Sequence, residues 1–483
     1  MSEKNLNNKI LNAAKWSSIT EVVVKLISPI INMILARVIA PEEFGVVATA
    51  TMIVSFADMF SDAGFQKYLV QHNFKNEKDK EDNANVAFWT NLTISLIICF
   101  IIYIFRHPIA NMVGNSGLGN VVFIASLQLI LTAFSSIQMA LYRRNFDFKT
   151  LFVSRVISAL IPVMVTLPLA YLGFSYWSII IGNLTRQLSD AVILTFKSKW
   201  KPKFYYNFQI LKEMFSFSIW TLIEAFSIWL TTWADSFIIG RYLTPYYLGL
   251  YKNSTSMVNA LFTIITGATT PVLFSSLSRL QTDDDRFNEV FLRFQKLVSL
   301  LVFPMGIGVF LFSDLATKLL LGEQWLEASN VIGIWALTSS LMIVLGNYCS
   351  ELYRAKGRPK LSFLAQVLHL IFLIPACIIS AQYGFWALVY TRSLMRLQFI
   401  IVHFIIMRLI VKFPITTIFK NIFPATISAL GMFVLGYFIK QIGQGMLWDF
   451  LSIFICAIIY LMFISMFPSV RIGIKSFIRN RTV

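Results

Sequence analysis

Apolar runs recur along nearly the whole of this 483-residue chain. Each run of about 18 to 25 residues is long enough to cross a hydrocarbon core about 30 Å thick as a helix. Hydrophobic residues make up 57% of the chain and charged residues only 13%, which is more apolar than a soluble domain. The runs lack the strict alternation of barrel strands, and a lipid-exposed backbone must satisfy its own hydrogen bonds. The sequence therefore predicts an all-α integral membrane protein.

About fourteen runs are predicted to be transmembrane helices. The first seven are Ala14–Ile39, Phe44–Phe65, Asn85–Phe105, Leu118–Leu141, Leu151–Leu172, Phe174–Phe196 and Met214–Gly240. The second seven are Leu248–Phe274, Leu297–Phe312, Val331–Leu352, Leu361–Ala381, Phe385–Met407, Ile415–Phe438 and Met446–Phe467. We expect two six-helix lobes, residues 1–205 and 206–410, followed by two additional helices and a tail in residues 411–483.

The net charge of +17 is distributed unevenly between alternate loops. If alternate loops are assigned to the cytoplasm, about 31 of the 41 basic residues lie inside and about five lie outside. The positive-inside rule then places both termini in the cytoplasm, and it accounts for the charge without a nucleic-acid partner. The outer loops are short, so we expect no extracytoplasmic domain.

An internal repeat supports the two-lobe division. Residues 34–45 are ILARVIAPEEFG and residues 238–249 are IIGRYLTPYYLG, a return of one pattern after about 204 residues. A second echo pairs residues 141–143 with residues 352–354, both Leu-Tyr-Arg. Six helices per half give both copies the same orientation, as in transporters with parallel repeats, so substrate is expected to bind between the halves.

The repeated motif also has a purely structural interpretation. Arg37 and Arg241 would lie at helix C-termini, where a cation meets the carbonyl ends of the helix. The proline would stop the helix and the glycine would permit the turn into the next one. We favour this capping role over a substrate role for the two arginines.

Polar residues form one-sided stripes on the first two helices of each half. Their spacing is that of one helix face. The stripes are Glu21, Lys25, Ser28 and Asn32; Thr51, Ser55, Asp58 and Asp62; Thr221, Glu224, Ser227, Thr231 and Asp235; and Lys252, Ser256, Asn259 and Thr263. Ionisable groups at membrane depth indicate a pathway or internal pairing. The predicted substrate pathway comprises Glu21, Lys25, Asn32, Asp58, Glu224, Asp235, Lys252 and Asn259.

A competing interpretation assigns the stripes to packing. Glu21 and Lys25 would neutralise each other at i and i+4, and serine and threonine hydroxyls would join helices. Arg186, Arg392 and Arg396 are secondary pathway candidates. They are interpreted as lying toward the cytoplasmic ends of their helices, where long basic side chains reach the interface.

Motifs for catalysis and cofactor binding are absent from the sequence. There is no GxxxxGK[ST] phosphate loop and no HExxH motif, and all four cysteines fall inside predicted spans. No metal site, cofactor or catalytic constellation is therefore predicted, and the chain is not expected to be an enzyme. Coupling to a proton or sodium gradient is left open.

The chain resembles the polysaccharide flippases of the multidrug/oligosaccharidyl-lipid/polysaccharide exporter superfamily, in the branch that serves O-antigen and colanic-acid-like repeat units. The resemblance is carried by AAKW at residues 13–16, ARVIAPEEFG at 36–45, DAGF at 62–65, GFSYW at 173–177, GRYL at 240–243 and YLGLY at 247–251. It implies two lobes in a V that move an undecaprenyl-diphosphate-linked oligosaccharide across the bacterial inner membrane by alternating access. It also implies membrane lipid, a polymerase and a chain-length regulator as partners.

Two alternatives remain open at this stage. One is a cation-coupled multidrug antiporter of the same superfamily, with Asp58, Glu224 or Asp235 as the ion site. Such proteins usually have twelve helices, so the extra pair speaks against it. The other is a membrane polysaccharide polymerase, which the short outer loops disfavour.

The two lysines of the stripes give a first test. Lys25 and Lys252 would attract a diphosphate as point charges, so replacing both with alanine is expected to abolish transport at normal protein levels. Transport of lipid-linked intermediates is the measurement. A double variant that transports normally would remove the two lysines from the pathway.

Overall fold

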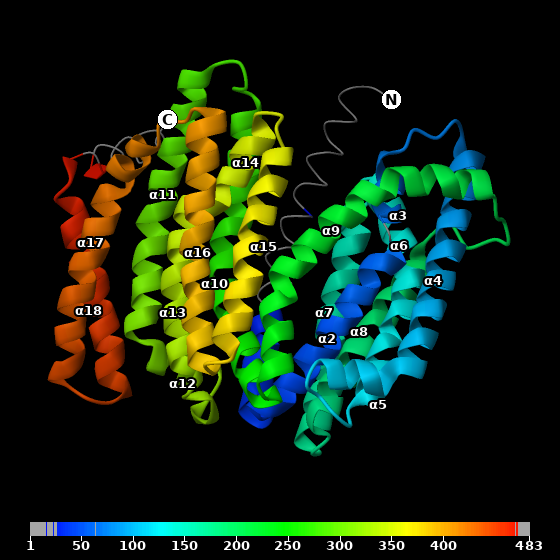
Figure 1. Cartoon of the computed structure of the whole chain (residues 1–483), viewed down its shortest axis with the longest axis horizontal. Coiled ribbons are helices and arrows are strands. Elements are labelled where there is room, and N and C mark those ends of the chain that lie inside the picture. The colour runs from blue at the N-terminus through cyan, green and yellow to red at the C-terminus, as the bar shows by residue number, and fades with distance from the viewer. Residues whose placement is uncertain (1–15, 17–22, 24–26, 63, 469, 472–483) are drawn as a thin grey trace. The chain divides into compact units, whose positions relative to one another are not determined.

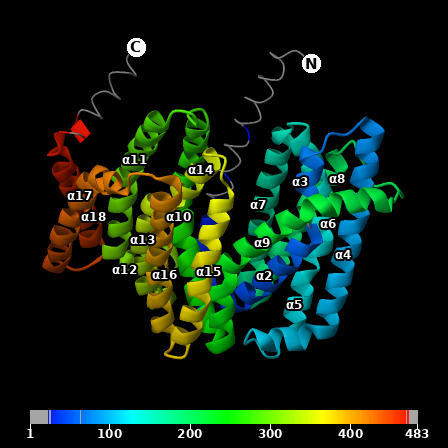
Figure 2. The ribbon, with the colours of Figure 1, turned by 45° about the horizontal axis from the view of Figure 1, so that its top comes forward.

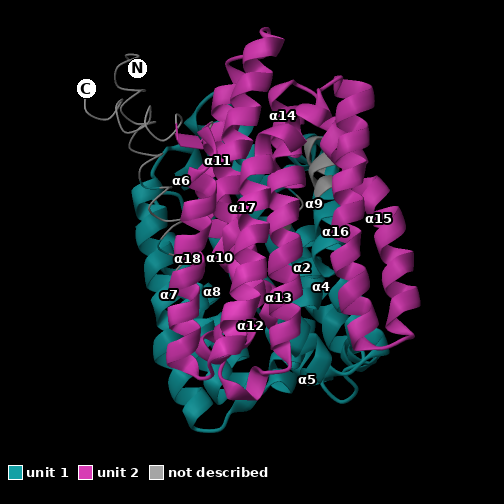
Figure 3. Cartoon of the chain, turned by 90° about the vertical axis from the view of Figure 1, so that its left-hand side faces the viewer, with its two compact units in different colours: residues 1–252 teal, residues 253–483 magenta. Residues whose placement is uncertain are grey.

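The computed structural model describes residues 16, 23, 27–62, 64–468 and 470–471. Every regular element within these residues is a helix. By internal contacts the chain divides into two compact units, residues 1–252 and residues 253–483 (Figure 3). The six-helix division predicted from the sequence has different boundaries, and it remains a prediction.

Unit 1 begins its described part with a helix over Ile27–Val38. The helices that follow are α2 (Pro41–Asp62), α3 (Phe65–Gln71), α4 (Glu77–Met112), α5 (Gly119–Ser126), α6 (Gln128–Arg144), α7 (Phe148–Tyr171), α8 (Ser175–Lys197) and α9 (Phe208–Tyr242). The next helix, α10 (Pro245–Ser278), starts in unit 1 and continues into unit 2.

Unit 2 holds the remaining elements (Figure 1). They are α11 (Asp284–Leu311), α12 (Ser313–Leu320), the short η1 (Glu323–Trp325), α13 (Ala328–Met342), η2 (Ile343–Asn347), α14 (Tyr348–Ala355), α15 (Lys360–Ala381), α16 (Phe385–Ile406), η3 (Met407–Val411), α17 (Ile415–Ile442) and α18 (Met446–Ser465). The last two helices pack side by side, and α17 also packs on α11 (Figure 2).

Eleven helical stretches in the described residues are long and apolar enough to cross a membrane. The prediction of an all-α multi-pass membrane protein is confirmed. Long helices also occupy the sixth and seventh predicted spans, as α8 and α9, but they fall outside these eleven. The count of fourteen spans therefore remains a prediction.

Several helices begin earlier than their apolar runs suggest. The helix α4 begins at Glu77, after Asn76, whose side chain accepts a hydrogen bond from the Asp79 amide at 2.8 Å. Likewise, α11 begins at Asp284 rather than Leu297, with Asp283 as its cap. Capped, polar first turns extend each helix beyond its apolar window, and hydropathy does not detect them.

Buried polar side chains join three helices inside unit 1. Ser61 of α2 donates to Asn91 Oδ1 of α4 at 2.8 Å, and Asn91 Nδ2 donates to Ser136 Oγ of α6 at 2.9 Å. All three side chains are buried. The bilayer core contains no water, and an apolar helix surface packs on lipid about as well as on another helix. Hydrogen bonds between buried polar side chains therefore stabilise the contact between these helices.

The two copies of the repeated motif meet in unit 1 at their glycines. A Cβ on Gly45 would lie 1.8 Å from the carbonyl oxygen of Pro245, and a Cβ on Gly249 would lie 1.8 Å from that of Pro41. The first turns of α2 and α10 therefore touch backbone to backbone. The contact is reciprocal, as expected of two copies related by a local two-fold axis.

This contact corrects the interpretation of the motif's glycine as a turn residue. Gly45 and Gly249 lie inside α2 and α10, and they are needed because only glycine lets the backbones approach so closely. The position of the arginines agrees with the capping prediction, since Arg241 lies in the last turn of α9 and Arg37 in the last turn of Ile27–Val38.

The glycine contact predicts a position-specific loss of stability. Gly45→Ala and Gly249→Ala should each destabilise the purified protein by about 1–3 kcal/mol, because the new methyl group forces the helices apart. The control is Gly308→Ala in α11, where no described atom lies within 4 Å of the added Cβ. Thermal unfolding in detergent measures the effect. Equal melting temperatures for all three variants would contradict the contact.

Candidate substrate-binding site

The site in unit 2 is built around Trp335 of α13. Its indole is 4% exposed, and its Nε1 donates a hydrogen bond to Asn259 Oδ1 of α10 at 3.1 Å. Asn259 was predicted from the stripe on that helix, and its side chain is otherwise exposed. The indole thus connects a predicted pathway residue to the interior of unit 2.

Two arginines of α16 lie against the same indole. The guanidinium carbon of Arg396 lies 3.4 Å from the Trp335 ring centroid, and that of Arg392 lies 5.4 Å from it. Arg396 also donates to the hydroxyl of Ser339, one turn beyond Trp335 on α13. We call these residues, with Asn259, the Trp335 cluster. The ring face attracts both cations, and a low-dielectric setting strengthens that attraction.

The position of these arginines corrects the prediction that they lie near helix ends. Arg396 lies in the middle of α16, roughly 15 Å from either end, and Arg186 lies in the middle of α8. Their anchoring at the interface by snorkelling stays a prediction. The sequence could not show that Trp335 and Ser339, about sixty residues away, receive Arg396 at that depth.

Irregular turns follow both helices of the Trp335 cluster. After α13 the chain continues as the π-helical turn η2, where the Val344 carbonyl accepts a hydrogen bond from Gln295 Nε2 of α11 at 2.8 Å. After α16 the chain continues as a second π-helical turn, η3. Such insertions are frequent at functional sites. They interrupt the regular α-helical hydrogen bonding directly after α13 and after α16.

In unit 1, Asp235 of α9 is held by neighbouring donors. Its carboxylate accepts from the Tyr251 hydroxyl at 2.7 Å, from the Ser236 amide at 2.7 Å and from the Ser236 hydroxyl at 3.2 Å. The side chain is 4% exposed. These bonds join α9 to the start of α10, so Asp235 has a clear structural role. Its part in a pathway stays a prediction.

Lys252 follows Tyr251 on α10 and contacts an aromatic ring of α9. Its Nζ lies 3.6 Å from the Trp233 ring centroid and also donates to the Thr232 carbonyl at 3.4 Å. The contact is of the cation–π kind, in which the ring face attracts the ammonium. Unit 1 and unit 2 thus each hold a basic group on a tryptophan.

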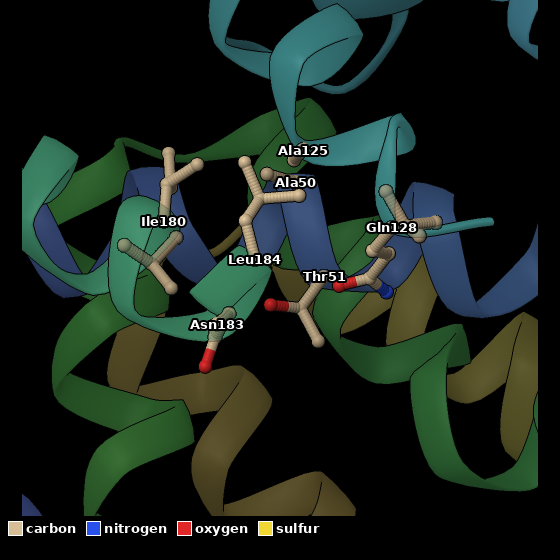
Figure 4. Close-up of a pocket in the computed structure, with 9 residues that line it drawn as sticks. Ala50, Thr51, Ala125, Gln128, Ile180, Asn183 and Leu184 are labelled. Atoms are coloured by element: carbon tan, nitrogen blue, oxygen red, sulfur yellow. The ribbon is translucent and has the colours of Figure 1, made fainter. Parts of the chain in front are cut away.

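The stripe on α2 faces other polar groups of unit 1. Thr51 lines a small pocket with Gln128 of α6 and Asn183 of α8 (Figure 4). Ser55, one turn further, accepts a hydrogen bond from Trp229 Nε1 of α9 at 3.0 Å. Asp58, on the same face, is half-buried. The stripe of α2 therefore faces polar groups of α6, α8 and α9 within unit 1.

Other predicted residues are not brought into a site. Glu21 and Lys25 lie outside the described residues, as does the side chain of Glu224 on α9. Asn32 is half-buried in Ile27–Val38, and Arg186 is half-buried in α8.

Two hydroxyl groups of the α9 stripe donate hydrogen bonds to backbone carbonyls of the same helix. Ser227 donates to the Ile223 carbonyl at 3.0 Å, and Thr231 to the Ser227 carbonyl at 2.9 Å. These two hydroxyls bond within α9, as serine and threonine commonly do inside helices, so these bonds do not join helices. The choice between a pathway and a packing role stays a prediction.

Sequence reasoning missed the tryptophans. Trp229, Trp233 and Trp335 all lie beside predicted polar residues, yet hydropathy counts an indole as apolar and ignores its N–H group and its ring face. Their position in the sequence could have indicated two of them, because Trp229 and Trp233 lie on α9, which carries a polar stripe. Trp335 lies on α13, which contacts the stripe of α10 through Asn259.

Comparisons with known proteins show similarity to proteins of polysaccharide biosynthesis. A family model described as polysaccharide biosynthesis protein matches residues 34–330. The succinoglycan biosynthesis transport protein ExoT of Rhizobium meliloti is 27% identical over 311 residues, which are 64% of this chain and 62% of that protein. The chain therefore spans less than two thirds of that relative. The lipopolysaccharide biosynthesis protein WzxC of Escherichia coli is 21% identical over 379 residues, 78% of this chain and 76% of that protein.

Among solved structures, the lipid II flippase MurJ in an inward closed conformation shares the fold. The TM-score is 0.73 at 15% sequence identity, and the match covers 96% of this chain and 100% of that one. The match leaves about 4% of the chain uncovered, which is less than half of α17 and α18 together, so it includes most of these two helices.

The stacking of Arg396 on Trp335 predicts a measurable coupling. In a double-mutant cycle with Arg396→Gln and Trp335→Leu, the two changes should couple by about 1–2 kcal/mol, because the stack is buried. The control cycle uses Arg106 and Tyr103, which lie 4.8 Å apart with the ring 46% exposed, and should give about 0.5 kcal/mol. Unfolding in detergent provides the energies. Additive effects in the first cycle would show that the stack contributes nothing.

Proposed function

Because this chain belongs to the polysaccharide biosynthesis protein family, whose members are membrane transporters and not enzymes, we propose that it is a flippase for undecaprenyl-diphosphate-linked oligosaccharide repeat units. It would move them across the bacterial inner membrane by alternating access, for surface polysaccharide biosynthesis. The family match over residues 34–330 carries this proposal. Two observations support it: relatives named for succinoglycan and lipopolysaccharide biosynthesis, and a fold shared with a lipid II flippase.

The Trp335 cluster suits an anionic, sugar-bearing headgroup. A diphosphate cannot cross a hydrocarbon core without counter-charge, and guanidinium groups bind phosphate oxygens in a bidentate manner. Arg392 and Arg396 supply two guanidinium groups from one face of α16, and Trp335 holds them in place. The cluster therefore offers positive charge at a depth where the headgroup must pass.

The proposal includes an architecture that the family resemblance implies. It has fourteen transmembrane helices in two six-helix lobes that form a V, with residues 411–483 supplying the last two helices and a tail. Both termini would be cytoplasmic, consistent with the distribution of basic residues. The pathway would include Glu21, Lys25, Asn32, Asp58 and Glu224 from the stripes, with Asp235, Lys252 and Asn259. The cargo would come from, and pass to, other enzymes of the glycan pathway, among them a polymerase with its chain-length regulator.

Cation-coupled drug antiport is the competing proposal within the same superfamily. The helix pair α17 and α18 and its coverage by the lipid II flippase fold favour the oligosaccharide cargo. Asp235 already accepts three hydrogen bonds from the protein, which reduces its capacity as an ion ligand. Transport in proteoliposomes under imposed proton or sodium gradients identifies the coupling ion and tests drug transport directly.

Deletion of the gene tests the flippase proposal in the cell. Undecaprenyl-linked repeat units should accumulate on the inner leaflet, and the surface glycan should be lost. Unchanged surface glycan without accumulation would reject the proposal. Drug sensitivity in place of a glycan defect would favour the antiporter.

Complementation of that deletion tests the Trp335 cluster. Arg392→Gln with Arg396→Gln should lower the rate of surface-glycan appearance at least about 10-fold at normal protein levels, because the headgroup loses its counter-charge. The matched control is Arg279→Gln with Arg408→Gln, two exposed arginines of unit 2 outside the cluster. Full complementation by both double variants would exclude the cluster from transport.

A further inference from the structure

A cavity of about 740 Å³ opens at one end of unit 1, away from every residue assigned above. It lies among the start of α4, the turn between α6 and α7, and the end of α8. The lining residues are Glu77, Lys80, Glu81, Leu141, Tyr142, Arg144, Asn145, Phe146, Asp147, Thr150, Lys197, Ser198, Lys199 and Trp200. The cavity is large enough for a small polar molecule or a lipid headgroup.

The acidic groups of the cavity are engaged by the protein. Glu77 pairs with Lys80, and Glu81 pairs with Lys203 at 3.0 Å. Asp147 caps α7 by accepting from the Thr150 amide at 3.1 Å and its hydroxyl at 2.8 Å. Glu77 and Glu81 are thus each neutralised by a lysine, whereas Asp147 bonds to neutral donors and keeps its negative charge.

The remaining basic groups of the cavity are not neutralised in this way. Arg144 donates to three backbone carbonyls, of which the closest is that of His72 at 2.7 Å, and so keeps its full charge. Lys197 and Lys199 are exposed, and neither has a hydrogen-bond or ion-pair partner among the described residues. Four basic side chains and three carboxylates line the cavity, and Lys203 neutralises one of the carboxylates from outside the lining, so the cavity carries net positive charge.

Two buried donors in the wall also lack acceptors. Within the described part of the chain, the Tyr142 hydroxyl and Trp200 Nε1 are buried without a hydrogen-bond partner. Trp200 is only 8% exposed, and an indole N–H can donate but not accept. Buried polar groups are normally paired, so unpaired donors beside cations indicate a ligand that supplies acceptor oxygens. A phosphate ester has this chemistry.

The chain that follows α8 indicates that the phosphate belongs to a lipid. Residues 197–208 are KSKWKPKFYYNF, in which lysines and then aromatic residues are concentrated. Phe196 and Phe204, on either side of the cavity's lysines in sequence, are 82% and 94% exposed. Exposed aromatic rings beside lysines are typical of segments at the headgroup level of a membrane, and the lysines attract anionic lipid.

This connection is fixed to α4. Trp89 Nε1 donates to the Lys203 carbonyl at 2.9 Å, and the Lys203 amide donates to Asn85 Oδ1 at 3.0 Å. Phe204 stacks on Trp89 with ring centroids 4.8 Å apart. The lysines of the cavity wall therefore precede a firmly anchored segment, as a defined binding site requires.

We propose that this cavity binds the phosphate headgroup of an anionic phospholipid, at a site separate from the transport pathway. Lys197, Lys199 and Arg144 neutralise the phosphate, and Tyr142 and Trp200 donate to its oxygens. Acyl chains lie outside, along Phe196 and Phe204. The site fixes the basic end of unit 1 to its leaflet.

Native mass spectrometry of the purified full-length protein tests the site with phosphatidylglycerol, phosphatidylcholine and glycerol 3-phosphate as separate probes. Phosphatidylglycerol should be retained in preference to phosphatidylcholine. Lys197→Gln with Lys199→Gln should weaken its retention about 25-fold, since each lysine near a lipid surface contributes about fivefold. Trp200→Phe, which removes one donor and keeps the ring, should weaken it several-fold.

The matched control is Lys149→Gln with Lys212→Gln, which removes two exposed lysines of unit 1 that do not line the cavity. This variant should retain phosphatidylglycerol as the unaltered protein does. Equal losses in the two double variants, or equal retention of the two lipids, would overturn the proposal. Binding of glycerol 3-phosphate as tight as that of phosphatidylglycerol would overturn the lipid source and assign a soluble phosphate ester. None of these outcomes depends on the transported cargo.

Discussion

A charge at membrane depth must be solvated by the protein itself, and the polar architecture of this chain follows from that constraint. In both units, tryptophan rings contact the cations at this depth. Arg396 and Arg392 lie on Trp335, and Lys252 lies on Trp233. An indole lowers the cost of a buried cation through the attraction between the cation and the face of the ring.

The fold was largely predictable because lipid imposes a simple rule on sequence. Twenty apolar residues in a row have few alternatives to a helix, and the all-α prediction depended on nothing else. The first residues of the helices were harder to predict, because the capping residues Asn76 and Asp283 lie in polar segments that resemble loops. The role of Gly45 was also out of reach: a close approach to Pro245 depends on two segments about 200 residues apart.

In each contact of the candidate site, the sequence indicated the polar or charged residue but not its aromatic partner. Helical spacing identified Asn259, and charge within a predicted span marked Arg392 and Arg396 as secondary candidates. Their common partner Trp335 has no distinguishing pattern in an apolar helix. The stripe residues Ser227 and Thr231 bond to their own helix, so equal spacing does not mean equal function. The proposed cargo rests on the family match, whereas the physical arguments yield positive charge and aromatic rings in membrane-spanning helices.

The contact of Gly45 with Pro245, and of Gly249 with Pro41, has a mechanical consequence. Ordinary helix pairs interlock through side-chain ridges and grooves, and turning one against the other means lifting ridges out of grooves. Where two backbones touch at glycine there are no ridges to lift. The starts of α2 and α10 therefore meet without interlocking side chains at the two glycines, so at this point no ridge of side chains opposes rotation of one helix against the other. Both surfaces of the contact come from the two copies of one sequence motif.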